Sequence, residues 1–238
     1  MDATNKTSKK LIRFLGDNAI TLCLVVLVVV IICINPKFFS FNVLRDVLLQ
    51  NATKLIMACG MMFVLISGGV DLSAGRILGL AAVLTASLGQ TIDYSRRFYP
   101  NMPDIPIIVP FLVALAVCML LGLFNGTVIA KFAIPPFIVT LGTQVIAWGV
   151  NLLYFDMEPN NSQPIGGVKK SITYMGSGLL GGKVPVIILI ALAVTLAVWF
   201  ILKKLRFGRN VYAVGGNYQA AHHSGINAQR VIMYAYMI

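Results

Sequence analysis

The chain has 238 residues, of which 58% are hydrophobic and only 11% are charged. This composition is typical of a protein that crosses a membrane several times, and it argues against a soluble globular domain. The net charge of +11 does not indicate nucleic-acid binding, because the cations are scattered between apolar runs and form no soluble basic face for a phosphate backbone. Anionic lipid headgroups are the expected counter-charge.

The first apolar run, residues 18–36, follows four cations near the N-terminus, Lys6, Lys9, Lys10 and Arg13. A signal peptide begins in the same way, but no small-x-small cleavage site follows this run, so it is predicted to be retained as a first membrane span. Residues 38–54 come next and have an amphipathic pattern, with Asn42 as a candidate N-cap. This segment either forms a helix of its own or extends the second span.

The second and third apolar runs, residues 55–70 and 77–92, are short and flank a turn that holds Asp71. Asp71 is the only acid closely bounded by apolar segments on both sides, and Arg76 is its nearest cation. A carboxylate at the bilayer centre costs roughly 2.5–3.5 kcal/mol unless it is paired or hydrated. Its presence here therefore indicates a structural or a functional role.

Both roles are open for this turn. In the structural role, Gly68 and Gly69 end the preceding helix, while Asp71, followed by Ser73, caps the next one. In the functional role, Asp71 lines a path through the membrane. The two roles are compatible, because broken helices commonly line transport sites.

Three longer apolar runs complete the set, at residues 105–130, 132–155 and 184–202. A helix needs about 20 apolar residues to span a bilayer, so the six runs together predict an all-α, polytopic transmembrane helical bundle with about six spans. An even number of spans puts the N-terminal cations and a second basic cluster, after the sixth run, on the same side of the membrane. The positive-inside rule predicts that this side is the cytoplasm.

Small and polar residues inside these runs point to helix packing. Gly122 with Gly126 forms a small-xxx-small face for close contact with another helix, and Pro135-Pro136 suits the start of the fifth span. Several polar side chains can hydrogen-bond either a neighbouring helix or a polar solute: Asn125, Thr140, Thr143, Gln144 and Asn151. On the outer side, residues 156–183 form a long connection that either contacts a partner or is a passive solvated loop.

No catalytic, cofactor or metal site is predicted from the residues. The cysteines lie inside apolar runs without CxxC spacing, and His222 and His223 have no Cys, Asp or Glu at ligand spacing. The run GSGLLGGK at 176–183 is only superficially like a phosphate loop, because Ser177 and Val184 occupy positions that the motif reserves for Gly and for Ser or Thr. Any ATP hydrolysis is therefore expected on another chain.

The segment after the sixth run, residues 206–227, is a basic, Gly-rich loop that looks soluble. Within it, Asn217 can cap a short helix, Gly225 supplies a left-handed stop, and one small face holds Ala220, Ala221 and Ser224. Helices shorter than roughly 12–15 residues are marginal in water, so this helix is predicted to need a partner surface.

Residues 215–227, GGNYQAAHHSGIN, closely resemble the coupling segment of the permeases of bacterial ABC importers for ribose and galactose. The blocks LISGGVDLSAGR at 65–76 and NGTVIAKFAIPPFIVTLGT at 125–143 resemble the same family. The wording DLSAGR and the loop at 94–106 are nearest to the galactose/methyl-galactoside branch. The resemblance covers nearly the whole chain and about the first two thirds of a roughly ten-span permease fold. It implies one truncated transmembrane permease domain, residues 1–238, with a cytoplasmic coupling loop at 203–230.

The resemblance implies an inner-membrane subunit that moves a monosaccharide, galactose- or ribose-like, and performs no chemistry itself. The implied partners are an ABC ATPase subunit, a periplasmic or extracellular sugar-binding protein, a second permease copy and membrane lipid. The residues expected to couple to the ATPase are Asn217, Ala220, Ala221, Ser224 and Gly225. The candidate residues of the translocation path or helix break are Gly68, Gly69, Asp71, Ser73, Arg76, Asn125 and Thr143. The alternative is an ion-coupled secondary transporter or channel, which would require more intramembrane acids than Asp71.

Overall fold

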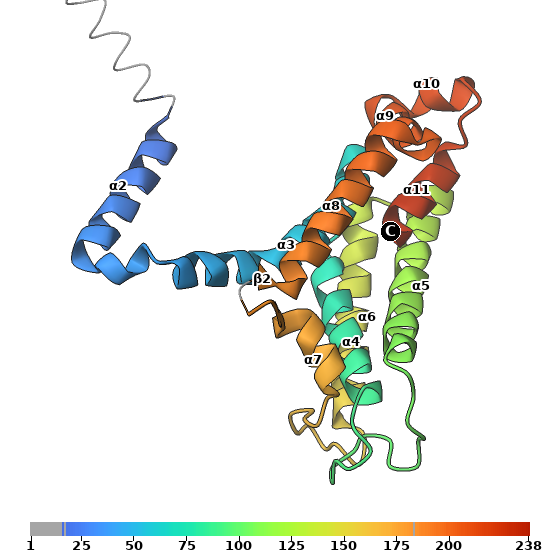
Figure 1. Cartoon of the computed structure of the whole chain (residues 1–238). Coiled ribbons are helices and arrows are strands. Elements are labelled where there is room, and N and C mark those ends of the chain that lie inside the picture. The colour runs from blue at the N-terminus through green and yellow to red at the C-terminus, as the bar shows by residue number, and fades with distance from the viewer. Residues whose placement is uncertain (1–15, 17, 183) are drawn as a thin grey trace, which may run out of the picture. The chain divides into compact units, whose positions relative to one another are not determined.

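A computed structural model describes residue 16 and residues 18–182 and 184–238 (Figure 1). The N-terminal cations Lys6, Lys9, Lys10 and Arg13 lie outside the described residues, as does Lys183 at the end of the GSGLLGGK run. The chain divides into two compact units, Met1–Leu48 and Leu49–Ile238. Each unit is described by itself.

The first unit contains α2 (Ala19–Ile34), the short 3₁₀ helix η1 (Pro36–Phe38) and the beginning of α3 (Phe41–Ile66). Nearly every residue of α2 is apolar, so the helix has no polar face, as expected for a helix surrounded by lipid. Helix α3 runs without a break through the amphipathic segment, which confirms that this segment extends the second predicted span. The cap differs from the prediction: Ser40 Oγ, rather than Asn42, accepts the amide of Val43 at 3.4 Å.

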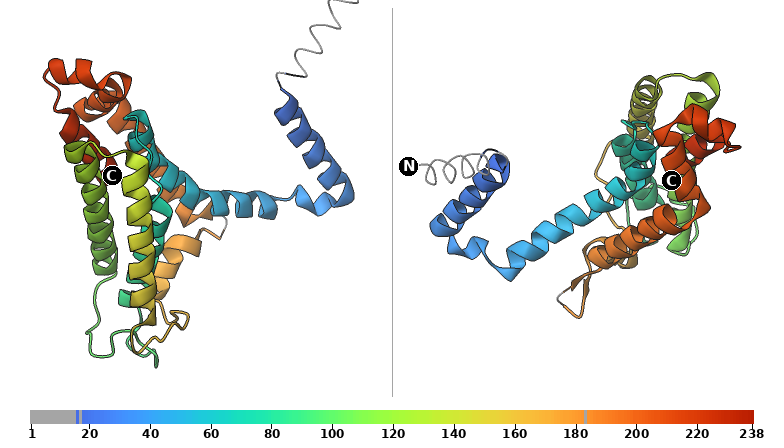
Figure 2. Two further views of the ribbon diagram at one scale, coloured as in Figure 1. Left: turned by 180° about the vertical axis from the view of Figure 1, so that it is seen from behind. Right: turned by 90° about the horizontal axis from the view of Figure 1, so that it is seen from above.

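The second unit is a helical bundle, as Figure 1 and Figure 2 show. Its long helices are the rest of α3, α5 (Ile108–Phe132), α6 (Pro136–Asp156) and α8 (Val186–Lys204), with the shorter α4 (Ala74–Leu88) packed against α5 and α6. The smaller elements are α7 (Lys170–Ser177), an antiparallel pair of β1 (Leu179–Leu180) with β2 (Val184–Pro185), α9 (Arg206–Gly216), α10 (Tyr218–His223) and α11 (Ala228–Met237).

Within the described residues, α3, α5, α6 and α8 are long and apolar enough to cross a membrane, and α2 and α4 are shorter apolar helices. These six helices coincide with the six predicted apolar runs. The prediction of an all-α, polytopic membrane bundle is therefore confirmed.

Helix α11 lies directly against α5 (Figure 2). A Cβ atom on Gly122 would collide with the backbone of Tyr236, and one on Gly126 would collide with the backbone of Met233. The two backbones thus touch where the small residues lie, as the small-xxx-small pattern predicted. The partner of this face is α11.

The core of the second unit gathers at one end of the bundle, under α9 and α10. Its buried residues come from α3, α8, α9, α10 and α11 and are Cys59, Phe63, Val198, Leu202, Val211, Val214, Ala221, Ala228, Val231 and Ala235. Residues 206–216 were predicted as a loop, and that prediction is wrong. They form α9, because Gly208, Val211 and Val214 recur at helical spacing and bury one face of the helix in this core.

The two loops at the opposite end of the bundle, residues 89–107 and 157–169, are fastened to each other (Figure 1). Gln90 is buried, donates from Nε2 to the carbonyl of Gly166 at 2.8 Å, and accepts the amide of Phe98 at 2.6 Å. Lys169 pairs with Asp104. These bonds give the end of the bundle away from α9 and α10 a defined surface.

Candidate functional site

The break between α3 and α4 begins with a regular helix stop. Gly68 has φ +84°, its amide bonds the carbonyl of Leu65 at 3.1 Å, and the amide of Gly69 bonds the carbonyl of Val64 at 2.9 Å. This pattern is the Schellman motif, in which a left-handed residue satisfies the last free carbonyls of a helix. Gly68 and Gly69 therefore end α3, as the sequence indicated.

Asp71 holds the turn after this stop. Its Oδ1 accepts two hydrogen bonds from Ser73, one from the amide at 2.7 Å and one from Oγ at 2.5 Å. The N-cap position of α4 belongs to Ser73, so the prediction that Asp71 is itself the cap is corrected by two residues. Asp71 instead forms an Asx-type turn that fixes Ser73 at the start of the helix.

A chain of hydrogen bonds continues from Ser73 across three helices. Asn125 of α5 donates from Nδ2 to Ser73 Oγ at 3.0 Å, and Thr143 of α6 donates from Oγ1 to Asn125 Oδ1 at 2.5 Å. Ser73 and Asn125 are 0% exposed and Thr143 is 2% exposed, whereas Asp71 is only partly buried. Four of the seven predicted path residues are thus joined in one polar network, with Asp71 at its accessible end.

The network lies inside the bundle rather than at its surface. Asn125 is seven residues from the end of α5 (132 − 125 = 7), and Thr143 is seven residues from the start of α6 (143 − 136 = 7). At 1.5 Å per residue, both positions are about 10 Å from the helix ends. Non-helical backbone at membrane depth is tolerated where it is buried in protein or lines a watery cavity. The segment from Ser67 to Ser73 meets this condition through its polar partners.

Tyr236 of α11 is a further member of the site that sequence reasoning missed. Its hydroxyl donates to the carbonyl of Val70 at 3.1 Å, and a Cβ on Gly69 would collide with the same phenol group. Tyr236 is 6% exposed. The available signal was a tyrosine in an apolar run, since a buried tyrosine hydroxyl usually has a hydrogen-bond partner.

Arg76 is not part of this network. Its guanidinium lies 5.4 Å from the centre of the Trp148 ring on α6, in cation–π geometry. The ion pairs found among the described residues join Arg45 to Asp46 and Lys169 to Asp104. The side chains of Arg76 and Asp71 are therefore held apart, although they are close in sequence.

The predicted short helix is present as α10. Asn217 Oδ1 accepts the amide of Ala220 at 2.9 Å, and Gly225 has φ +83°. The face is divided differently from the prediction, however. Ala220 and Ser224 are exposed, but Ala221 is 5% exposed and packs into the core with α9 and α11. Ala221 thus fastens α10 to the bundle and is removed from the open face.

The elements around α10 reach back to the helix break. A Cβ on Gly215 of α9 would overlap the carbonyl oxygen of Ile66, the last residue of α3. Ile66 lies two residues before Gly68, where the Schellman turn begins. The short helices at this end and the polar network are therefore neighbours through α3 and α11.

Comparison with known proteins places the chain among transport proteins. The family described as "Branched-chain amino acid transport system / permease component" matches residues 43–238. The galactose/methyl galactoside import permease protein of Escherichia coli (strain K12) is 36% identical, over 100% of this chain and 70% of the relative. Its counterpart in Haemophilus influenzae is 39% identical, over 94% and 67%, and the ribose import permease protein of that organism is 32% identical, over 98% and 68%. No solved structure matches the chain.

Proposed function

Because this chain belongs to the family of these permeases and is the membrane permease subunit of an ABC-type sugar importer, we propose that it forms the path for a galactose- or ribose-like monosaccharide across a bacterial inner membrane. A separate ATPase subunit supplies the energy, and a sugar-binding protein outside the membrane delivers the solute. Two copies of the chain face each other across the path. These partners follow from the kind of importer to which the relatives belong.

The observation that carries this proposal is the polar network at the helix break. A sugar presents several hydroxyl groups, each of which both donates and accepts hydrogen bonds. In the described part of the chain, Ser73 uses only Oδ1 of Asp71, so Oδ2 is available to a hydroxyl of the solute. The buried residues Asn125 and Thr143 hold the turn that presents this carboxylate. Asp71 is thus assigned contact with the sugar, and the other members position it.

The helix stop gives the path its movable element. Gly68 and Gly69 separate α3 from α4, so the two helices can change their mutual angle by rotation at a few backbone bonds. Hinge residues of this kind absorb large changes in φ and ψ while the flanking helices stay intact. We assign Gly68 and Gly69 this hinge role.

ATPase docking is assigned to the open face of α10. Ala220 and Ser224 allow close approach because their side chains are small, and Asn217 and Gly225 define the two ends of the helix. Ala221 joins α10 to α9 and α11. A push on α10 is therefore passed to the end of α3 through Gly215 and to the helix break through Tyr236.

Uptake measurements test the proposal directly. The full permease is supplied with its ATPase and binding protein in proteoliposomes, and the uptake of labelled galactose and ribose is followed with ATP inside. We expect uptake that requires ATP and is reduced at least tenfold by Asp71→Asn, because the neutral amide keeps the turn but loses the charged acceptor for the sugar.

The same preparation separates the alternative. An ion-coupled secondary transporter would take up sugar without ATP hydrolysis and would stop when an ionophore collapses the ion gradient. Uptake that persists with a hydrolysis-deficient ATPase and disappears with the ionophore refutes the ABC mechanism. Normal uptake by a stably inserted Asp71→Asn variant refutes the role of Asp71 in the path, while leaving the transport function itself intact.

A further inference from the structure

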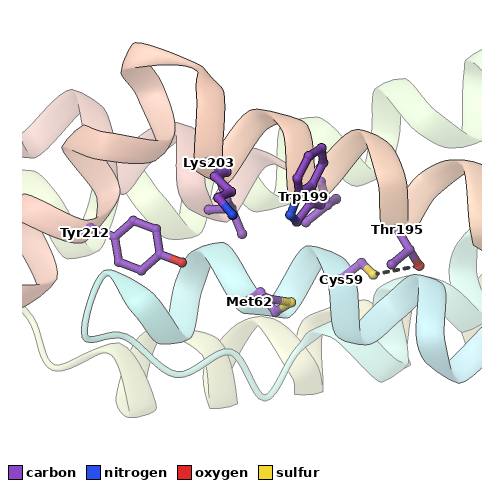
Figure 3. A pocket seen from close by; sticks show the side chains of 8 residues that line it. Cys59, Met62, Thr195, Trp199, Lys203 and Tyr212 are labelled. Atoms are coloured by element: carbon purple, nitrogen blue, oxygen red, sulfur yellow. Dashed lines mark hydrogen bonds between the residues drawn. The ribbon is translucent and has the colours of Figure 1, made fainter.

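An apolar groove of about 450 Å³ lies outside the polar network, between α3, α8 and α9 (Figure 3). This volume falls in the range of small-molecule pockets, roughly 300–1,000 Å³. Its lining residues are Cys59, Met62, Thr195, Val198, Trp199, Leu202, Lys203 and Tyr212. The polar atoms of the lining are at its ends: Thr195 bonds Cys59 at 3.6 Å at one end, and Lys203 and Tyr212 lie at the other.

The groove runs from the end of α8 into the apolar part of that helix. Thr195 and Lys203 are eight residues apart (203 − 195 = 8), which corresponds to about 12 Å along the helix axis. Trp199 is 51% exposed and Lys203 extends over its ring at 5.6 Å from the centre. A tryptophan followed by lysines at a helix end is typical of the level of the lipid headgroups. The groove thus begins at headgroup depth and continues into the hydrocarbon.

A cluster of cations surrounds the headgroup end of this groove. Lys203 and Lys204 form the last turn of α8, and Arg209 of α9 donates to the carbonyl of Lys204 at 3.4 Å. Arg209 and Tyr212 are three residues apart and so share a face of α9. Residues 159–238 contain no aspartate or glutamate at all. This part of the chain therefore offers the cations no carboxylate counter-ion.

We propose that the groove is a binding site for an anionic phospholipid, with an acyl chain between α3 and α8 and the phosphate at Lys203 and Arg209. The apolar floor of Cys59, Val198 and Leu202 suits a hydrocarbon chain, and the unpaired cations at its mouth supply the charge complementarity. A protein partner rich in acids would satisfy the cations but would leave the groove empty. The lipid satisfies both at once.

Native mass spectrometry of the delipidated full permease tests this site. Phosphatidylglycerol and phosphatidylethanolamine with the same acyl chains are added separately, and the bound fraction is measured. We expect preferential binding of phosphatidylglycerol, reduced about fivefold for each lost cation in Lys203→Gln and Arg209→Gln. The control Lys131→Gln removes an exposed cation from the end of α5, away from the groove, and should bind lipid like the wild type.

A second variant tests the apolar half of the site without altering charge. Met62→Trp enlarges a side chain that lines the groove and is already 42% exposed, so the bundle itself should be preserved. We expect this variant to lose most of the bound phosphatidylglycerol while its elution volume and helicity stay normal. Equal binding of the two lipids, or full retention by Met62→Trp, overturns the proposal.

Two other occupants are distinguished in the same experiment. If the cations serve the ATPase instead, Lys203→Gln and Arg209→Gln lower ATPase retention and leave phosphatidylglycerol binding unchanged, which overturns the lipid site. If a second copy of the chain fills the groove, Met62→Trp changes the dimer fraction and wild-type protein binds no lipid there. That outcome also overturns it.

Discussion

Asp71→Ala removes the acceptor of both hydrogen bonds from Ser73 and should loosen the whole network behind it. Ser73 is fully buried, so its amide and hydroxyl lose their partner in a place where water has little access. A hydrogen bond to a charged group contributes about 1.5–3 kcal/mol in soluble proteins, whereas side-chain bonds between membrane helices average about 0.6 kcal/mol. For these two bonds together we expect a loss of about 1–3 kcal/mol.

Asp71→Asn should lose much less, because the amide oxygen occupies the position of Oδ1 and accepts the same two bonds. The assay is thermal unfolding of purified variants in one detergent, followed by tryptophan fluorescence. For a chain of 150–250 residues, each kcal/mol shifts the midpoint by about 2–4 °C. The control Asp93→Ala removes an exposed acid from an outer loop and should leave the midpoint unchanged. A midpoint for Asp71→Asn as low as that of Asp71→Ala would refute the hydrogen-bond reasoning, since only charge separates aspartate from asparagine here.

The other predictions concern the end of the bundle that holds α9, α10 and α11. Gly215→Ala should destabilise the permease by about 1–3 kcal/mol through overlap with α3, while its neighbour Gly216→Ala, with open space around it, should be neutral in the same melting assay. Tyr236→Phe should cost about 0.5–1.5 kcal/mol and lower sugar uptake relative to ATP hydrolysis; an unchanged ratio would contradict the coupling role. Ala220→Arg should abolish co-purification of the ATPase without affecting insertion, whereas His222→Gln should retain it.

Features coded by a few neighbouring residues were predictable from the sequence. The Schellman stop at Gly68, the cap of α10 by Asn217 and the left-handed Gly225 each depend on contacts within about five residues. The position of the cap on α4 shows the limit of such local codes. Asp71 and Ser73 are both good capping residues, and only the backbone of the folded chain decides between them.

Long-range contacts were not predictable, because nothing in one sequence joins residues far apart. Ser73 and Asn125 are 52 residues apart, and Tyr236 bonds a carbonyl 166 residues away. Helix α9 was missed for another reason. Its glycines and arginines made the segment look like a loop, although Val211 and Val214 have the spacing of a buried helix face. The inward position of Ala221 likewise depends on the core around α10.

The contact between Gly215 and Ile66 has a mechanical consequence. Most contacts between helices pass through side chains, which can change rotamer and so take up a small displacement. Here a backbone touches a backbone, with no side chain between them to yield. A movement of α9 toward α3 meets the end of that helix without slack. The linkage then behaves as a stiff lever, and its stroke at Gly68 is set by the angle of α9 rather than by the softness of the packing.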